Sequence, residues 1–348
     1  MRPPATGGTA RPGAGRPAEP PAPGTAGAAR GRARNAAVTL GPAAAAVVLL
    51  AFMPSLLPAV SLLNLQSALG LALFACATNL LVGYGGLVSF GQGAFYGIGA
   101  YVIALAWLHW QVPFWASFIA APFAGAAIAL LVGLVALRTR RLYFALLTLA
   151  FSQLFYVIVL QQTGFTGGAN GVFGAILPPF LADPGNAYLF TLAVAGLGLL
   201  ALWRITRSPF GMTLRAIREN RERAEALGVN VFAHQLLAFV IAGGFCALAG
   251  TLFVVLDQSA NPDLLNWTQS GYPIFMAVLG GQFVFLGPAL GALIYEQGRD
   301  VVLASFPDWQ LVFGLLLLIV VMFSPDGMAG LLARGWGAAR RRLRGVRR

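Results

Sequence analysis

The chain has 348 residues, of which 58% are hydrophobic and 10% are charged, and its formal net charge is +12. A soluble protein of this size needs far more polar surface, so the composition excludes a water-soluble globular domain. Repeated windows of about 20 residues without charge predict an all-α integral membrane protein, because only helices satisfy their own backbone groups in lipid. The sequence has no Lys, so the basic charge comes from Arg. Arg residues retained on the cytoplasmic side of a membrane explain the net positive charge better than nucleic-acid binding does.

The N-terminal residues 1–37 are rich in Arg, Pro and Gly and predict a disordered cytoplasmic extension, because such a segment cannot bury a core. A transmembrane domain is expected at 38–333 and a basic cytoplasmic tail at 334–348. About ten transmembrane helices are expected within the domain, some of them short or broken. The apolar segments are 38–60, 62–82, 88–109, 114–137, 142–161, 187–203, 232–256, 270–281, 287–303 and 309–323.

Arginine placement tests this count. The N-terminus, the Arg residues at 138–141, the charged segment 204–228 and the tail all fall on the cytoplasmic side when ten spans are assumed, with both termini inside. The last part of the chain decides between nine and ten spans, because two spans in 257–323 would place the Arg-rich tail outside the cell. A break between Gly281 and Gly287 divides 257–323 into three spans and keeps the Arg-rich tail inside.

Two Gly-rich segments interrupt the apolar pattern. The first, 79–101, has seven Gly in 23 residues, and the second, 272–292, repeats a Gly-Gly pair followed by a new helix start. Such segments serve tight helix packing or, as interrupted helices in two halves of a transporter, a pathway near the membrane midplane. On the second interpretation the path residues are Asn79, Ser89, Gln92, Gly93, Gly280, Gly281 and Gln282.

The segment 204–228 is the one long charged stretch between apolar segments, with six Arg and three Glu. Ser208 and Pro209 are typical of a helix start, Thr213 offers a second start, and Gly228 a stop. Composition favours one helix over 214–227, with pairs spaced for side-chain contact. The pairs are Arg215–Glu219, Arg218–Glu222, Glu219–Arg223 and Arg221–Glu225. A solvent-exposed helix that served only to hold this loop on the cytoplasmic side would need only a few Arg. We therefore expect a helix that docks onto a partner.

Chemistry within the chain is limited. A phosphate-binding Walker loop is impossible without Lys, and Cys76 and Cys246 fit packing better than metal binding or a disulfide. His109 and His234 are far apart, which disfavours a membrane enzyme, and no cofactor is expected. An ion- or proton-coupled carrier would use acids within spans, where Glu296 and Asp300 lie beside Arg299; a local ion pair is the simpler explanation. A passive channel would leave the charged segment unexplained.

Together, these motifs resemble the LivM-type permeases of branched-chain amino acid importers driven by ATP-binding cassette (ABC) subunits. The similarity covers about 60–333 and is closest at 207–211 and 215–228, and it includes the closing motif 323–332. It implies a bacterial inner-membrane, non-enzymatic permease with four kinds of partner: cytoplasmic ATPase subunits, a second related permease, a periplasmic or extracellular binding protein, and membrane lipid. Import of another small neutral solute, such as urea or an amide, is the alternative.

By the same resemblance, the charged segment is the coupling helix that sits in a groove of the ATPase. Its residues are Arg207, Ser208, Pro209, Gly211, Arg215, Arg218, Glu219, Glu222, Glu225 and Gly228. The chain departs from the family pattern at two places. Gln282 and Phe283 stand where Gly and a small or polar residue are usual, and Asp326 stands where a basic residue is common.

Overall fold

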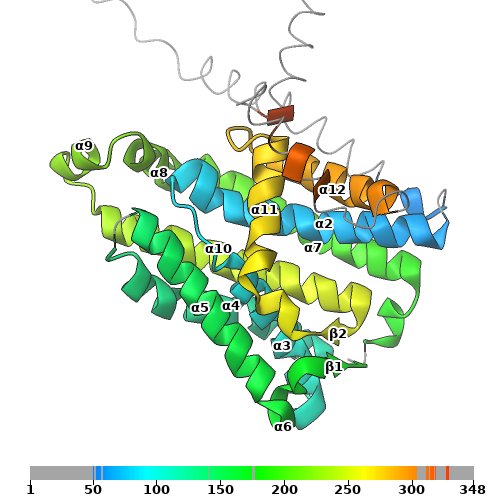
Figure 1. Ribbon diagram of the computed structural model, residues 1–348. Coiled ribbons are helices and arrows are strands. Elements are labelled where there is room, and N and C mark those ends of the chain that lie inside the picture. The colour runs from blue at the N-terminus through cyan, green and yellow to red at the C-terminus, as the bar shows by residue number, and fades with distance from the viewer. Residues whose placement is uncertain are drawn as a thin grey trace, which may run out of the picture. The chain divides into compact units, whose positions relative to one another are not determined.

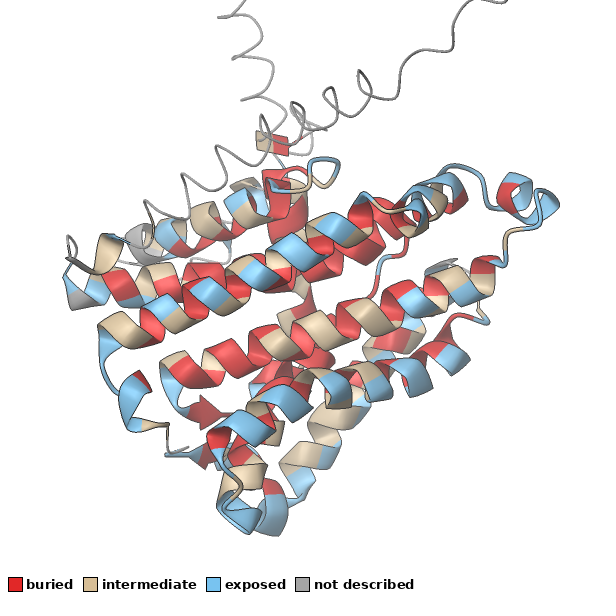
Figure 2. Cartoon of the chain, turned by 180° about the vertical axis from the view of Figure 1, so that it is seen from behind, coloured by how far each residue is buried: buried red, intermediate tan, exposed pale blue. Residues whose placement is uncertain are grey.

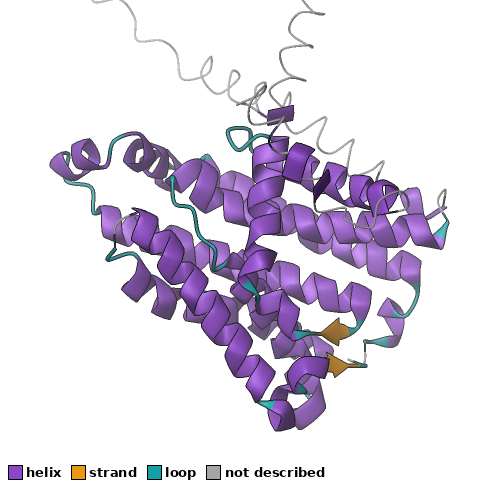
Figure 3. Cartoon of the chain, viewed as in Figure 1, coloured by secondary structure: helices purple, strands orange, loops and turns teal. Residues whose placement is uncertain are grey.

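The computed structural model describes residues 52–55, 58–139, 141–174 and 177–303, with Leu50 and the short stretches 311–312, 314–316, 318 and 327–328. The expected extension at 1–37, the tail at 334–348 and most of the expected spans at 38–60 and 309–323 lie outside these residues. Helices make up nearly all of the described part (Figure 3).

The α-helices are α2 (Ala59–Asn79), α3 (Gln92–Trp110), α4 (Phe114–Ala136), α5 (Arg141–Gln161), α6 (Thr163–Thr166), α7 (Pro184–Thr206), α8 (Pro209–Glu219), α9 (Arg221–Ala226), α10 (Val231–Asp257), α11 (Trp267–Gly280) and α12 (Gly287–Leu303). The π-helix η2 (Leu80–Gly85) continues α2. The 3-10 turns are η1 (Met53–Ser55), η3 (Gly168–Asn170), η4 (Pro179–Leu181) and η5 (Pro262–Leu265), and the strands are β1 (Val172–Phe173) and β2 (Ser259–Ala260).

Among the described residues, six helices are long and apolar enough to cross a membrane, and each coincides with an expected segment. They are α2 with η2, α3, α4, α5, α7 and α10. The expected spans at 270–281 and 287–303 are α11 and α12, which have only 14 and 17 residues. The described residues therefore confirm an all-α protein with six candidate spans, and they do not establish the full count of ten.

Burial divides the long helices into a central and an outer set (Figure 2). In the most apolar window of α2 with η2, 78% of residues are buried, and in α10 61%, against 28% in α4 and 17% in α5. Side chains such as Phe123 and Leu131 of α4 and Leu142 of α5 are exposed. Because these outer faces are apolar, they suit contact with lipid.

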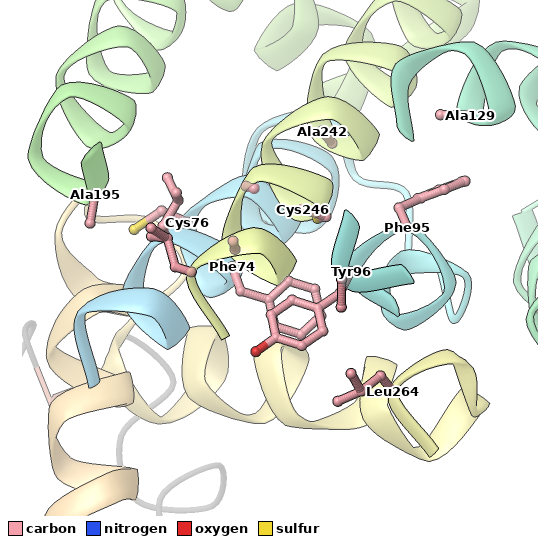
Figure 4. Packing of buried hydrophobic residues seen from close by; sticks show 14 of the residues in the cluster. Phe74, Cys76, Phe95, Tyr96, Ala129, Ala195, Ala242, Cys246 and Leu264 are labelled. Carbon is pink, nitrogen blue, oxygen red and sulfur yellow. The ribbon is translucent and has the colours of Figure 1, made fainter. Parts of the chain in front are cut away.

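Small residues bring the central helices close together. A Cβ atom at Gly99 of α3 would overlap the Ala247 carbonyl of α10, and one at Gly250 of α10 would overlap the Tyr96 carbonyl of α3. Close backbone approach of this kind drives helix packing where no hydrophobic effect acts between helices. Larger side chains fill the space around the contact, with the Phe74 and Tyr96 rings 4.6 Å apart (Figure 4).

Both expected helix breaks are present. Gly86 has φ 66° and ends η2, and an extended stretch then leads to α3. Gly281 has φ 111° and ends α11, and α12 begins at Gly287. A left-handed φ of this kind is readily adopted by Gly alone. Between the breaks, α11 runs steeply across α2 and α10 (Figure 1).

The structure has two ends, joined by α7 and α10, which run in opposite directions. One end carries α8 and α9, and we call it the α8 end. At the other, β1 and β2 pair antiparallel, with Val172 opposite Ala260 and Phe173 opposite Ser259, and we call it the β end. This pairing ties the loop before α7 to the loop before α11.

Candidate functional site

The helix α8 begins as the sequence predicts. Ser208 is its N-cap, with its Oγ accepting a hydrogen bond from the Gly211 amide at 3.4 Å, and Pro209 takes the first helical position. Gly211 also allows close approach to the Thr206 carbonyl, where a Cβ would overlap. Leu214 and Ile217 are buried on one side of α8, so the helix lies with an apolar face on the body of the protein.

The predicted single helix over 214–227 is wrong, because the chain is extended at Asn220 (φ −154°, ψ 102°) and divides it into α8 and α9. The Asn220 side chain accepts a hydrogen bond from the Arg223 amide at 2.8 Å and caps α9. Thr213, expected as a second start, lies inside α8 and donates to the Pro209 carbonyl. Gly228, at φ 83°, follows the end of α9.

Of the four expected charge pairs, the described residues show Arg221–Glu225, with Nε and Oε1 2.9 Å apart. Two other Arg side chains turn inward to aromatic rings. The Arg215 guanidinium carbon lies 4.7 Å from the centre of the Tyr84 ring, and that of Arg218 lies 4.6 Å from the Phe283 ring. Cation–π contacts of this type contribute about 0.5–1 kcal/mol each at exposed sites.

Arg218 connects α8 to both helix breaks. Its Nη1 donates a hydrogen bond to the backbone carbonyl of Gly83 in η2, while its guanidinium lies over Phe283 in the α11–α12 break. The helix that leads to the first break also contacts the second break, because Asn79 Nδ2 at the end of α2 donates to the Gln282 carbonyl at 3.1 Å. A carbonyl freed by a helix break needs such a donor when it is buried.

A cavity of about 490 Å³ opens at this junction. It lies where α8 faces the two breaks. Two guanidinium groups, one carboxylate and the backbone near two helix ends therefore line the same cavity. Its lining residues are Gly83, Tyr84, Arg215, Arg218, Glu219, Gln282 and Phe283.

The remaining residues of the expected coupling segment lie nearby. Arg207 stacks on Trp203 at 4.5 Å at the end of α7, and Glu222 is exposed in the first turn of α9. On the same end, Leu227 is 79% exposed and Met212 is 59% exposed. This surface combines exposed charge with exposed apolar side chains, as protein interfaces commonly do.

The expected path residues separate into two groups. Gln282 lines the cavity and accepts from Asn79, and Gly280 and Gly281 end α11 directly before it in the chain. Ser89, Gln92 and Gly93 form the other group, at the start of α3, and are buried. There, Ser89 Oγ accepts from the Gln92 side-chain amide at 3.3 Å, and Cys246 Sγ donates to Gln92 Oε1 at 3.1 Å.

The group of Ser89, Gln92 and Gly93 anchors the start of α3. The Gly93 amide donates to Ser270 Oγ at 2.8 Å, and Ser270 Oγ donates to the Phe90 carbonyl at 2.7 Å. Cys76 and Cys246 are buried free thiols, in agreement with a packing role. Among the described residues, no group of three His, Cys, Asp or Glu side chains could hold a metal ion.

Sequence reasoning missed the aromatic partners Tyr84 and Phe283. Both stand in Gly-rich breaks, and Phe283 belongs to the departure from the family pattern, which was the available signal. The second departure, Asp326, lies outside the described residues.

A family model described as "Branched-chain amino acid transport system / permease component" matches residues 60–322, well over half of the chain. The chain belongs to this permease family. The match begins in α2 and extends past α12, so it includes both helix breaks and the α8–α9 segment. Together with the six long apolar helices, it identifies a multi-pass membrane permease.

Curated relatives agree with this family. The permease is 29% identical over 278 residues to the high-affinity branched-chain amino acid transport system permease protein LivM of Salmonella typhimurium, covering 72% of this chain and 65% of the relative. It is 25% identical over 206 residues (53% of this chain, 59% of the relative) to a probable LivM protein of Methanocaldococcus jannaschii.

Another relative carries a different name. The autoinducer 2 import system permease protein LsrC of Salmonella paratyphi B is 31% identical over 191 residues, covering 51% of this chain and 53% of the relative. The chain thus spans less than two thirds of the length of the curated relatives it matches here. No solved structure matches it.

Proposed function

We propose that this permease is the transmembrane subunit of an ABC importer, and that α8 with α9 receives the movement of cytoplasmic ATPase subunits. The observation that carries the proposal is the position of Arg218, which bonds to the Gly83 carbonyl in η2, just before the first helix break, and lies on Phe283 in the second break. A displacement of α8 would therefore act on both breaks at once.

The α8 end is assigned to the cytoplasm. Six Arg residues lie in the segment from the end of α7 to α9, and Arg138 follows α4. Basic residues are retained on the cytoplasmic side of membrane proteins, which supports this orientation. The β end then faces the periplasm or the cell exterior, where a substrate-binding protein would deliver its cargo.

The cargo proposed is a branched-chain or related amino acid, supported by the family match and the LivM relatives. The relative named for autoinducer 2 import keeps another small solute, such as urea or an amide, as the alternative. A second, related permease subunit would complete the path. Exposed apolar faces of α4 and α5 are available for such a neighbour or for lipid.

In this mechanism the chain itself hydrolyses nothing. Binding of the ATPase moves α8, the Arg218 contacts pull on η2 and on the α11–α12 break, and the Asn79–Gln282 bond makes the two breaks move together. Movement at paired helix breaks is a recurring way to open a pathway in transporters. The expected path residues Asn79, Gly280, Gly281 and Gln282 lie at this junction, and Ser89, Gln92 and Gly93 would hold α3 in place beside it.

Reconstitution tests this assignment. The permease is incorporated into proteoliposomes with its ATPase, second permease and binding protein, and leucine uptake and ATP hydrolysis are measured together. Arg218→Ala should reduce uptake about tenfold or more while ATP hydrolysis continues, since one charged hydrogen bond and one cation–π contact are lost. Arg138→Ala, an exposed Arg that follows α4 and lies outside the charged segment, is the matched control and should change neither rate.

A carrier coupled to protons is the competing function, and the buried Glu296 of α12 is the observation that favours it. The same proteoliposomes distinguish the two. An ABC permease takes up leucine only with ATP, whereas uptake driven by a proton gradient without ATP would contradict our proposal. Full uptake by Arg218→Ala would remove the coupling role of α8.

A further inference from the structure

The β end contains a second cavity, of about 310 Å³, which the coupling mechanism does not use. It lies among α2, α3, α10, η5, α11 and α12, at the opposite end from α8. Ligand sites of small molecules begin at about 300 Å³, so the cavity has the size of a site for one small solute. We call it the outer chamber.

Charged groups of both signs line the outer chamber. Glu296 is only 6% exposed, whereas Asp263 and Arg299, which also line the chamber, are exposed. An acidic residue buried in a membrane helix is costly and is a marker of a functional site. Acid and base in one cavity complement a ligand that carries both charges.

Two lining side chains have polar atoms without a hydrogen-bond partner among the described residues. Gln66, which is 2% exposed, has its Nε2 donor unsatisfied, and Asn261 has its Oδ1 acceptor unsatisfied. A buried polar atom without a partner destabilises a protein. One is a donor and the other an acceptor, so a single ligand with a carboxylate and an ammonium group would satisfy both.

The rest of the wall is largely apolar. Leu252 of α10 and Leu264 of η5 are buried on it, and the Tyr96 ring stands between Phe74 and Phe253, at 4.6 Å and 6.1 Å. Figure 4 shows Tyr96 and Leu264 in the same region of the interior. An aliphatic side chain would gain by burial against this surface.

We infer that the outer chamber binds one zwitterionic α-amino acid with an aliphatic side chain. Its carboxylate faces Gln66 Nε2 and Arg299, and its ammonium group faces Asn261 Oδ1 and Glu296. This inference rests on the proposed function, to which it adds a binding site within a single permease chain. The substrate passes from the binding protein into this chamber before it reaches the junction at Asn79.

Binding is measured directly on the purified full-length chain in lipid nanodiscs, without ATPase or binding protein. The probes are L-leucine, 4-methylpentanoate, which lacks the amino group, and isoamylamine, which lacks the carboxylate. Leucine should bind saturably, and each analogue should bind about tenfold or more weakly, because each loses the contacts of one charged group.

Charge-specific variants assign the two halves of the site. Glu296→Gln should weaken leucine and isoamylamine by about tenfold or more and leave 4-methylpentanoate unchanged. Arg299→Gln should weaken the binding of leucine and 4-methylpentanoate by about tenfold or more and leave the binding of isoamylamine unchanged. Arg138→Gln, an exposed Arg remote from the chamber, should leave all three unchanged.

Gln66→Met separates a ligand role from a structural one. It removes a buried donor that has no partner, so the unliganded protein should melt at the same or a higher temperature while leucine binds more weakly. Gln153→Met is the matched control. Gln153 in α5 also has an unsatisfied amide atom, Oε1, but does not line the chamber, so leucine binding should not change.

A chamber filled only by solvent would bind none of the probes, and that result overturns the inference. Equal affinity for leucine and both analogues, or Gln66→Met and Gln153→Met with identical leucine affinities, would overturn it as well. ATP-dependent uptake in the complete assembly with no leucine bound to the permease alone would reject the chamber and leave the proposed function standing. Saturable binding without ATP-dependent uptake would reject the proposed function instead.

Discussion

The side-chain amide of Asn79 donates a hydrogen bond to the backbone carbonyl of Gln282, which lies 203 residues further along the chain, at 3.1 Å. Asn79 ends α2, and Gln282 follows the end of α11, so this bond joins the two interrupted helices. It also lies beside Gly83, whose carbonyl accepts from Arg218 of α8. Three segments distant in sequence therefore meet through one buried amide and one guanidinium group.

Asn79→Leu should destabilise the permease by about 1–3 kcal/mol, because the partly buried Gln282 carbonyl loses its donor. The measurement is thermal unfolding of the purified protein in detergent. Thr191→Val is the control, since the Thr191 hydroxyl in α7 is buried with no hydrogen-bond partner among the described residues. Equal melting temperatures for both variants would mean that the Asn79 bond does not hold the breaks together.

Gly99→Ala and Gly250→Ala should each lower stability by about 1–3 kcal/mol, because the added methyl group has to push α3 and α10 apart. Gly196→Ala in α7 should be neutral or stabilising by up to about 1 kcal/mol, since nothing lies near its new Cβ and Ala favours a helix. The free energies of unfolding of the three variants are compared by chemical denaturation, with tryptophan fluorescence as the signal. A loss of stability as large for Gly196→Ala would contradict the packing explanation.

The orientation of the two ends is testable by labelling. Both native Cys side chains are buried, so a membrane-impermeant maleimide should react only with a Cys placed at an exposed position. Phe173→Cys in β1, where the native ring is 70% exposed, should react in intact cells. Glu222→Cys in α9 should react only in inside-out vesicles. The reverse pattern would place α8 outside the cell.

Leu227→Asp should weaken binding of the ATPase subunits by about tenfold or more, because an exposed apolar side chain at an interface is replaced by a charge. Co-purification and surface binding assays measure this. Leu227 is 79% exposed, so the melting temperature of the isolated permease should stay the same. Unchanged ATPase binding would exclude this residue from the docking surface.

Local signals predicted much of this architecture. Ser208 with Pro209, and Gly228, mark helix ends through their own chemistry, and the Gly pairs at both breaks do the same through their backbone freedom. Apolar runs located all six long helices. In each case the physical cause lies within a few residues of sequence.

One miss has a local cause. Composition favours a continuous helix through Asn220, but the Asn220 side chain accepts from the Arg223 amide and caps a new helix, so the chain is extended there. The causes of the other misses are not local. Arg218 and Glu222 have the right spacing to pair, but the Phe283 ring and the Gly83 carbonyl compete for the guanidinium. Gln66 and Asn261 come together through helix packing that no spacing in the sequence reveals.

The extended residue Asn220 has one more consequence, for the integrity of the chain. It is exposed and precedes the exposed Arg221 and Arg223, so trypsin should cut the folded protein after one of these two Arg residues. The pieces 1–221 and 222–348 stay attached, because α10 packs between α2, α3 and α4, and α12 packs on α2. The two fragments, co-expressed as separate polypeptides, should therefore co-purify as a complementing pair, which makes α8 and α9 the place where this permease can be divided into two genes.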